Sequence, residues 1–289
     1  MNQSKANTIQ AYLRQTEQRL AQAGFSEAGR EARLLLAHLL CQSPAALPLW
    51  PGSLSSVQQA TLEGYLLRRL AGEPLQYVLG ETEFMSLPFA VSPAVLIPRG
   101  DTERIVEAAI ARLGAWSGPL RIADLCCGSG AIGISLAHFL PRAQVWASDI
   151  SAAALDVAQA NAAQNGVAER MHFLQGDLFA PFAGLPPFAA ILTNPPYIPS
   201  GEMPYLQAEV RREPALALDG GRDGLDYYRR LIPTAREYLQ AGGLLFLETG
   251  YDQRESVGSL LLASGYAVLQ TIRDYGQNHR GFVAQKSEK

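Results

Sequence analysis

The residues with the clearest chemical potential are Asn194, Pro195, Pro196 and Tyr197, which directly follow the apolar run Phe188–Thr193. That run predicts a buried strand, so the tetrapeptide is expected at the carboxyl end of a strand, where α/β sheets bind their ligands. The Asn194 side-chain oxygen and the Pro195 carbonyl can both accept hydrogen bonds from one NH₂ group, and the tandem prolines stiffen the backbone. We therefore expect this element to bind a planar nitrogen, with Pro196 supporting the turn and Tyr197 against the flat face of the ligand.

The chemistry that this arrangement favours is methyl transfer to the bound nitrogen. An amide or exocyclic amine is a poor nucleophile because its lone pair is delocalised. Two acceptors that hold its hydrogens aim the lone pair at an electrophilic methyl group, and such positioning can lower a barrier by about 7–11 kcal/mol without a strong general base. Asn194 and Pro195 are the expected catalytic groups. A rigid Pro-Pro turn with a buried tyrosine is the structural alternative.

A turn of small residues between a predicted strand, Leu120–Leu125, and a predicted helix over residues 131–140 is the expected cofactor site. Small residues let the chain bend tightly and bring backbone N–H groups and a helix N-terminus near a ligand, although topology alone can also produce such a turn. Asp149 follows a second predicted strand, where it can accept hydrogen bonds from ribose hydroxyls or cap the helix that starts at Ser151. The turn residues are Cys126, Cys127, Gly128, Ser129 and Gly130.

The type of cofactor follows from the spacing of the glycines. The pattern is D-x-x-x-G-x-G, so both the pyrophosphate fingerprint G-x-G-x-x-G and the phosphate loop are absent. An acidic Asp124 at the strand end suits a cation better than a pyrophosphate, which favours the sulfonium of S-adenosyl-L-methionine, with S-adenosyl-L-homocysteine as product. Asp177 is expected either to reach the adenine amine or to be a plain turn residue. Leu178 is expected to contact the adenine ring, and Asn194 to contact the cofactor as well.

The elements that must position these residues form a predicted α/β domain. Five short apolar runs, mostly separated by helical patterns, predict a parallel sheet covered on both faces: residues 120–125, 144–148, 171–175, 188–193 and 244–248. Residues 266–272 and 281–285, joined by a polar turn, predict an antiparallel hairpin at the sheet edge. We expect residues 99–289 to form this Rossmann-like domain.

The N-terminal part of the chain has a different pattern. Apolar residues recur at helical spacing through residues 1–72, with Ser26 and Ser55 near expected helix starts, and predict a small helical bundle that docks a substrate or partner. Residues 73–98 then predict a β-hairpin linker, because short β-rich runs at Leu75–Leu79, 89–91 and 95–97 are separated by glycine and proline.

Composition and charge narrow the possible functions. With 24 Lys and Arg against 27 Asp and Glu, the net charge of −3 argues against a nucleic-acid-binding surface. Three cysteines without a C-x-x-C pair and four scattered histidines predict neither a disulfide framework nor a metal site. Prolines interrupt the uncharged stretches 34–62 and 178–201, and the first residues lack the pattern of a secretory signal. We expect a cytoplasmic monomer with no membrane partner.

Together these motifs resemble the HemK-type family of protein-(glutamine-N5) methyltransferases, which modify peptide chain release factors. The resemblance covers nearly all of residues 73–285, whereas the N-terminal helices match the family in size and kind only. It is carried by the cofactor turn, by Asp149, by Asn194 to Tyr197 and by flanking blocks at residues 72–77, 87–89, 96–99, 101–103, 176–178, 213–214, 223–226 and 273–276.

The resemblance implies a class I S-adenosylmethionine-dependent methyltransferase fold. It implies that the acceptor is the glutamine of the Gly-Gly-Gln loop of class 1 release factors, with its amide bound by Asn194 and Pro195. Three departures stand out: Cys126 and Cys127 replace the frequent glycine and threonine, and Gly100 replaces a frequent proline. Arg99 and Glu103 are expected either to line the cofactor cleft or to form structural ion pairs.

Three other functions remain open at this point. A glutamine methyltransferase acting on a ribosomal protein would share every site residue, although the tail block at residues 273–280 and the hairpin favour the release-factor branch. An adenine-N6 methyltransferase would need a basic recognition domain, and residues 1–72 carry only 7 basic against 4 acidic groups. A nucleoside-binding scaffold would have no need of the Asn-Pro-Pro-Tyr element.

Overall fold

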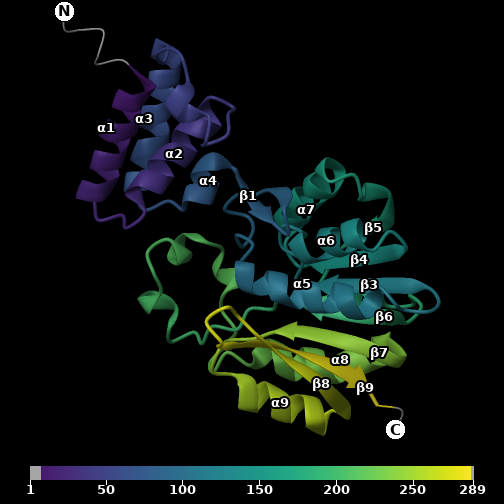
Figure 1. The fold of residues 1–289 in the computed structure, drawn as a ribbon. Helices are drawn as coiled ribbons and strands as arrows, with labels where there is room; N and C mark the ends of the chain where they lie inside the picture. The colour runs from purple at the N-terminus through teal and green to yellow at the C-terminus, as the bar shows by residue number, and fades with distance from the viewer. Residues whose placement is uncertain (1–7, 288–289) are drawn as a thin grey trace, which may run out of the picture. The chain divides into compact units, whose positions relative to one another are not determined.

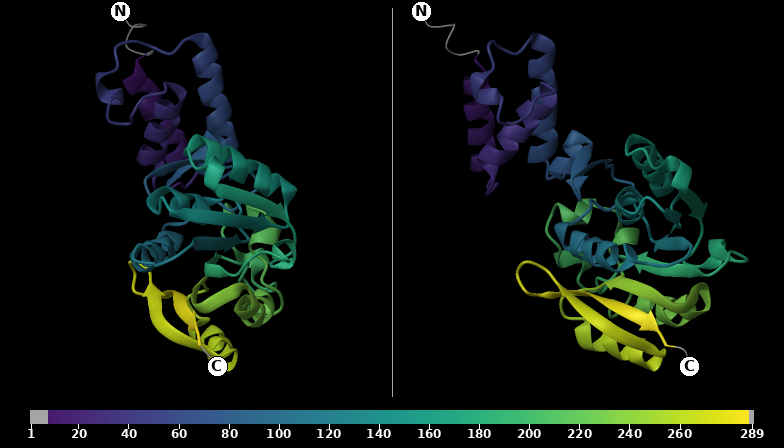
Figure 2. Two further views of the ribbon diagram at one scale, coloured as in Figure 1. Left: turned by 90° about the vertical axis from the view of Figure 1, so that its right-hand side faces the viewer. Right: turned by 45° about the vertical axis from the view of Figure 1, so that its right-hand side comes forward.

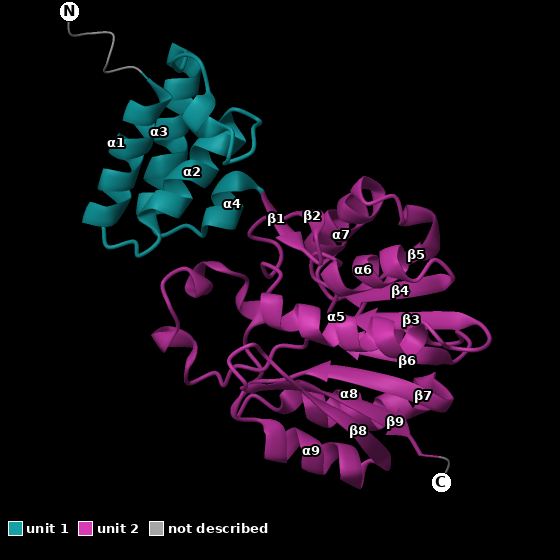
Figure 3. Ribbon diagram, viewed as in Figure 1, with its two compact units in different colours: residues 1–80 teal, residues 81–289 magenta. Residues whose placement is uncertain are grey.

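Residues 1–80 and 81–289 form two units in the computed structural model, which describes residues 8–287 (Figure 3). The first residues, where no secretory signal is expected, lie outside the described part. The structure thus divides the chain once, between Gly80 and Glu81, whereas the sequence analysis places boundaries after residues 72 and 98. Within the described ranges, no helix is both long and apolar enough to cross a bilayer.

The first unit is the expected bundle of amphipathic helices, whose apolar stripes pack on one another. Helix α3 begins where the sequence predicts, because Ser55 forms a capping box with Gln58. Helix α2 starts after Glu27, which makes no side-chain cap. The helices of this unit are α1 (Ile9–Gln22), α2 (Ala28–Leu39), α3 (Ser56–Leu70) and α4 (Leu75–Leu79), with a 3₁₀ turn, η1 (Leu47–Leu49).

The strand expected at Leu75–Leu79 is wrong, since these residues form helix α4. Pro74 precedes the helix, and Gly80 ends it with a φ of 77°, a left-handed conformation that suits glycine. Leu75 and Val78, three residues apart, are buried in the core of the bundle. A five-residue apolar run has no visible period of its own, so packing on neighbouring helices decides its conformation.

A buried ion pair joins α3 to α2. Arg69 Nε and Nη2 donate to the two carboxylate oxygens of Glu31 at 2.7 and 2.9 Å, and Arg69 Nη1 donates to the Glu73 carbonyl at 3.0 Å. The guanidinium also lies over the ring of Phe25, 4.1 Å from its centroid. Arg69 is only 2% exposed, so its charge depends on these partners rather than on water.

The second unit is built on the expected α/β sheet, with the strand order β5-β4-β3-β6-β7-β9-β8. The first five of these strands are parallel, and β9 runs antiparallel to both β7 and β8. The predicted edge hairpin is therefore confirmed, and Figure 2 shows it in yellow. The strands are β3 (Leu120–Leu125), β4 (Ala143–Asp149), β5 (Met171–Gln175), β6 (Phe188–Thr193), β7 (Leu239–Glu248), β8 (Tyr266–Arg273) and β9 (His279–Lys286).

Helices cover both faces of this sheet (Figure 1). One face carries α5 (Gly100–Leu113), α6 (Ala131–Phe139) and α7 (Ala152–Gln164), and the other carries α8 (Asp226–Tyr238) and α9 (Arg254–Ala263). Because both faces are covered, β6 is buried at every position, as its unbroken apolar sequence predicts. The 3₁₀ turns of the connecting segments are η2 (Ala168–Arg170), η3 (Ala180–Phe182), η4 (Met203–Tyr205), η5 (Val210–Arg212) and η6 (Ala215–Ala217).

A small hairpin, β1 (Glu81–Phe84) and β2 (Leu87–Ala90), begins the second unit. The buried Asn161 of α7 holds it, since Asn161 Oδ1 accepts from the Ala90 N–H at 2.7 Å and Nδ2 donates to the Ala90 carbonyl at 3.0 Å. The same Nδ2 donates to the Ser129 carbonyl at 2.9 Å, which ties the hairpin to the predicted cofactor turn. The strand expected at residues 95–97 is wrong, because this segment is a bend followed by irregular backbone and belongs to neither sheet.

We predict that Arg69→Ala destabilises the protein by about 3–5 kcal/mol, because it leaves the Glu31 carboxylate buried without a countercharge. The matched control is Arg19→Ala, which removes the exposed pair with Glu63 and is expected to cost less than about 1 kcal/mol. Urea denaturation of the full chain, followed by circular dichroism, measures both. Equal, small losses in the two variants would contradict a structural role for the buried pair.

Candidate active site

The register of the sheet brings the carboxyl ends of four parallel strands to one level. Leu125 of β3 pairs with both Ser148 of β4 and Thr193 of β6, and Thr193 in turn pairs with Leu247 of β7. The residues that follow these partners therefore emerge side by side at one edge, and we call them the edge row: Cys126, Asp149, Asn194 and Glu248.

A pocket opens at this edge, within the second unit, and it brings most of the predicted site residues together. Gly130, Pro195 and Tyr197 lie outside its lining; Pro195 is buried and Tyr197 half-buried. Arg99 is the one cation among the described residues that line the pocket. The predicted residues in the lining are Cys126, Cys127, Gly128, Ser129, Asp149, Asp177, Leu178, Asn194 and Pro196.

The cofactor turn is a strained backbone segment held by hydrogen bonds. Cys126, Gly128 and Gly130 have φ values of 56°, 53° and 80°, all in the left-handed region. Glycine is favoured at Gly130 by its φ, and a Cβ there would also lie 3.2 Å from the Cβ of Ala158. Cys126 adopts the same region with a side chain, so the departure from the family pattern is accommodated at the cost of local strain.

The two thiols of this turn are chemically quiet. Burial, and to a smaller extent the nearby Asp149 carboxylate, raises the pKa of Cys126 to about 12. Burial likewise raises the pKa of Cys127 well above its usual value. Both side chains are therefore neutral at physiological pH, and neither offers a thiolate nucleophile to the pocket.

Asp149 links the turn to the start of the next helix. Its Oδ2 accepts from the Gly128 N–H at 2.9 Å and its Oδ1 from the Ser151 N–H at 3.0 Å. Ser151 itself caps α7 through its hydroxyl. A carboxylate has about four acceptor sites, so each oxygen of Asp149 keeps capacity for a ligand hydroxyl. The predicted helix cap is therefore Ser151 and not Asp149, which supports that cap and keeps room for the predicted ligand contact.

Asp124 does not supply the pocket with a negative charge, contrary to expectation. Its side chain is fully buried and is not part of the lining. Its Oδ2 accepts from the Gly133 N–H at 2.8 Å, whereas Oδ1 has no partner among the described residues. Burial raises the pKa of Asp124 to about 7, against the lowering effect of the Gly133 hydrogen bond. It therefore holds the first turn of α6 from inside the core.

Asp177 and Leu178 lie in the pocket wall after β5. Asp177 forms an ion pair with Arg230 of α8, a partner that was not expected from the sequence. Leu178 has a φ of 47° and is buried, and its carbonyl accepts a hydrogen bond from the Ser148 hydroxyl at 3.3 Å. Their contacts with an adenine ring stay a prediction.

The Asn-Pro-Pro-Tyr element is locked in place by a glycine-rich loop, residues 219–224. Ile198 pairs with Asp219 in an isolated bridge, which brings that loop against the tetrapeptide. A Cβ on Gly220 would lie 2.7 Å from the Cα of Tyr197, and one on Gly224 would lie 2.3 Å from the Tyr197 carbonyl oxygen. Only glycine permits so close an approach of two backbones.

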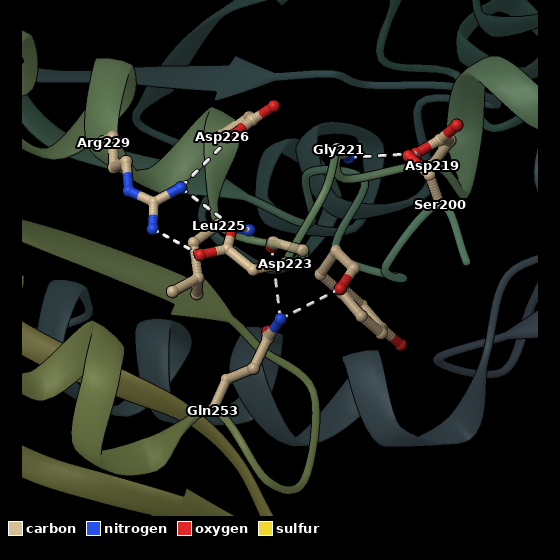
Figure 4. Close-up of polar contacts among 10 residues, drawn as sticks. Ser200, Asp219, Gly221, Asp223, Leu225, Asp226, Arg229 and Gln253 are labelled. Atoms are coloured by element: carbon tan, nitrogen blue, oxygen red, sulfur yellow. Dashed lines mark hydrogen bonds and ion pairs between the residues drawn. The ribbon is translucent and has the colours of Figure 1, made fainter. Parts of the chain in front are cut away.

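Gln253 joins these segments from the start of α9 (Figure 4). Its Nε2 donates to the carbonyls of Tyr197 and Gly224 at 2.9 and 3.1 Å, and its Oε1 accepts from the Gly250 N–H at 2.9 Å. The side chain is 7% exposed, so these bonds replace those that water would make. In the same view Asp223 receives hydrogen bonds from Arg229.

The amide of Asn194 contacts Thr102, which in turn contacts Glu248, and sequence reasoning missed both residues. Its Nδ2 lies 3.4 Å from the hydroxyl oxygen of Thr102, in the first turn of α5, and that hydroxyl lies 2.5 Å from Oε2 of Glu248. Thr102 lines the pocket with Asn194. The sequence carried a signal for Glu248, because a carboxylate ends the predicted strand 244–248, but its partner lies 146 positions away.

Both predicted alternatives apply to Arg99, whereas Glu103 follows neither of them. Arg99 lines the pocket and forms an ion pair with the buried Glu213, whose other oxygen accepts from the Ile97 N–H at 3.0 Å. Glu103 is not part of the lining and instead accepts from the Met85 N–H of the small hairpin at 2.6 Å. Glu213 thus holds the extended segment before α5 against the pocket.

Known proteins share both the sequence and the architecture. Residues 11–80 match the family described as PrmC N-terminal domain, and residues 115–209 match the Methyltransferase small domain. A release factor glutamine methyltransferase of Moorella thermoacetica is 48% identical over 284 residues, 98% of this chain and 100% of that protein. The enzyme of that name from Escherichia coli is 40% identical over 252 residues, 87% and 90% of the two chains.

Among solved structures, a methyltransferase from Pyrococcus furiosus has a TM-score of 0.51 at 17% identity and covers 81% of this chain and 100% of that chain. This likeness concerns the fold alone. Together with the strand order and the matched methyltransferase domain, it confirms the predicted Rossmann-like class I methyltransferase fold with an N-terminal helical region.

We predict that Gln253→Met loosens the loop around the Asn-Pro-Pro-Tyr element, because the carbonyls of Tyr197 and Gly224 lose their donor. The loss of these hydrogen bonds is expected to destabilise the loop by about 1–3 kcal/mol. Hydrogen exchange read by mass spectrometry should become faster in peptides that cover residues 197–224. The control is Gln270→Met, whose side chain makes an exposed contact with Arg112. Unchanged exchange in the Gln253 variant would reject the anchoring role.

Proposed function

Because the chain belongs to the family of release factor glutamine methyltransferases, we propose that it methylates the side-chain amide nitrogen of a glutamine in class 1 peptide chain release factors. The acceptor is the glutamine of the Gly-Gly-Gln loop, and S-adenosyl-L-methionine is the methyl donor. The observation that carries this proposal is the edge row, which places Asn194 beside Cys126 and Asp149 at the mouth of one pocket.

The pocket suits this cofactor by its charges and its donors. Among the described residues of the lining, Asp149 and Asp177 are acidic and Arg99 is the single cation, which is paired with Glu213. A pyrophosphate would meet this surface unfavourably, whereas the ribose hydroxyls of a nucleoside can donate to Asp149. When bound, the cofactor supplies an electrophilic methyl group on a sulfonium. Asp149 and the cofactor turn would hold its nucleoside, with Leu178 against the adenine.

The acceptor amide would be held by the tetrapeptide. The Asn194 side-chain oxygen and the Pro195 carbonyl each accept one hydrogen of the substrate NH₂ group. Because both hydrogens are held, the nitrogen cannot turn away from the methyl group. Tyr197 would pack on the amide plane. Burial raises the pKa of the Tyr197 hydroxyl, and the Glu248 carboxylate adds to this effect, so the phenol stays neutral and takes no proton.

No strong base is needed in this scheme. The nitrogen is nearly neutral before transfer, and its proton becomes acidic once it carries the methyl group, so solvent at the pocket mouth can accept that proton. The residues of the site therefore act through alignment and through the dipoles of two fixed acceptors.

We further propose that the helices of residues 1–80 dock the protein substrate, supported by their match to the N-terminal domain of the family. A cytoplasmic location and a monomeric state stay predictions of the sequence.

The acceptor is tested by offering radiolabelled S-adenosyl-L-methionine to the full chain with a release factor, with ribosomal proteins and with DNA in parallel reactions. Mass spectrometry of the labelled product locates the methyl group. We expect label on the glutamine of the Gly-Gly-Gln loop alone. Label on a ribosomal protein or on adenine, with none on the release factor, would overturn the proposal.

We predict that Asn194→Ala lowers the rate of methyl transfer at least ~100-fold, as expected when a fixed acceptor is lost from a preorganised site. Cofactor affinity should stay nearly normal, because the nucleoside contacts remain. Single-turnover transfer and calorimetry measure the two quantities separately. Wild-type turnover in this variant would refute the alignment mechanism.

We predict that Asp149→Ala weakens cofactor binding by about 1–3 kcal/mol, through loss of charged hydrogen bonds to ribose and of the bond that holds the Gly128 N–H. The matched control is Asp156→Ala, an exposed aspartate on α7. Calorimetric titration with S-adenosyl-L-homocysteine compares the two variants. Equal affinities would reject the assignment of Asp149 to the ribose.

A further inference from the structure

We propose that Thr102 and Glu248 are positioning residues, which fix the orientation of the Asn194 amide so that its oxygen, and not its NH₂ group, is presented to the substrate. This inference rests on the proposed function, since it concerns the same acceptor site. It adds two residues, from α5 and from β7, that touch neither substrate nor cofactor in the proposed mechanism but act through Asn194.

Two independent features of the fold bring the three residues together. The register of β6 with β7 pairs Thr193 with Leu247, so Asn194 and Glu248 emerge as neighbours on the edge row. Helix α5 contributes Thr102 from its first turn, and the residue is 5% exposed. Glu248 is 2% exposed, and water is therefore largely replaced by protein around this contact.

The direction of the hydrogen bonds follows from the number of protons. The Thr102 hydroxyl has one hydrogen, and at 2.5 Å from Oε2 it donates that hydrogen to the Glu248 carboxylate. The Thr102 oxygen can then only accept, and its neighbour at 3.4 Å is the Nδ2 of Asn194. The amide nitrogen is thereby committed to Thr102, which leaves Oδ1 to accept a hydrogen from the ligand.

This commitment matters because an asparagine amide is nearly symmetric in shape. If it turned over, its NH₂ group would face the NH₂ group of the substrate glutamine, and two donors would meet. A buried carboxylate that holds the threonine hydroxyl as a donor excludes that orientation. The arrangement explains why a carboxylate is kept in the core at this point, where its desolvation is otherwise unfavourable.

The ionisation of Glu248 gives the arrangement a pH dependence. Burial raises the pKa of Glu248 to about 7; the Thr102 hydrogen bond lowers it, Asp101 raises it, and the guanidiniums of Arg280 and Arg99 lower it. Above this pKa the carboxylate accepts from Thr102. Below it the carboxyl group can itself donate to the Thr102 oxygen, which frees the threonine hydrogen and removes the preference for one orientation of Asn194.

The decisive comparison is Thr102→Val against Thr102→Ser in the full chain. Valine keeps the shape but removes the hydroxyl, and we expect kcat for methylation of a release factor to fall at least ~10-fold, with the Kd for S-adenosyl-L-homocysteine within ~2-fold of wild type. Serine restores the hydroxyl and should restore most of kcat. Thr234→Val, which removes an exposed hydroxyl bonded to the Arg230 carbonyl, serves as the matched control.

A spectroscopic measurement tests the same point without any turnover. In protein labelled with ¹⁵N-asparagine, the side-chain amide of Asn194 is assigned as the signal absent from Asn194→Ala. We expect Thr102→Val to shift that signal and Thr102→Ser to leave it close to its wild-type position. If Thr102→Val does not fold, Glu248→Gln takes its place: the wild-type loss of kcat below pH about 7 should disappear, and kcat at pH 8 should be lower than in wild type.

The outcomes separate this inference from the proposed function. A wild-type enzyme that methylates no release factor defeats the proposed function, while the Asn194 signal still decides the orientation. A wild-type enzyme that is active, together with an unshifted Asn194 signal and unchanged kcat in Thr102→Val, overturns the inference alone. In the substitute variant, an Asn194 signal and a pH profile that match those of wild type would overturn it as well. If the role of Thr102 were purely structural, Thr102→Val would lower the stability of the protein without lowering kcat selectively at an unchanged Kd for S-adenosyl-L-homocysteine.

Discussion

The parallel pairing of β3 with β4 and β6, and of β6 with β7, determines where the edge row of the candidate site lies. Pairing in one register sets Leu125, Ser148, Thr193 and Leu247 at the same level, so the next residue of each strand belongs to the edge row. A shift of one residue in any pair would turn the side chain after that strand to the opposite face of the sheet. The unbroken burial of β6 between two helix layers makes such a shift costly.

Around the edge row, the backbone is held in conformations that few residues adopt freely. Three positive φ angles in the cofactor turn are maintained by the bonds from the Gly128 N–H to Asp149 and from Asn161 to the Ser129 carbonyl. Tandem prolines and the glycine-rich loop at residues 219–224 do the same for the tetrapeptide, with Gln253 between them. The site is therefore rigid before a ligand arrives, which suits a mechanism that works by alignment.

Two buried carboxylates support this site from different depths. Asp124 holds the start of α6 through the Gly133 N–H, behind the cofactor turn, whereas Glu248 stands in the edge row and contacts Asn194 through Thr102. Burial raises the pKa of each to about 7, so both are near their ionisation point at neutral pH. The neutral thiols of Cys126 and Cys127 add no charge to this environment.

The amino-acid sequence by itself determined the class of fold and where most of the predicted site residues would gather. Local signals in the sequence identify a helix or strand and the end of it at which a ligand is expected. Such signals here are the strand and helix periods, the small residues at 126–130 and the tetrapeptide at 194–197. What only the tertiary structure decided are the contacts between distant segments, such as Thr102 with Glu248 and Gln253 with Tyr197. The helix at Leu75–Leu79 and the burial of Asp124 belong here too, because packing on other elements determines both. Residues far apart in the chain carry no local sign of one another, so their meeting follows from the folded sheet.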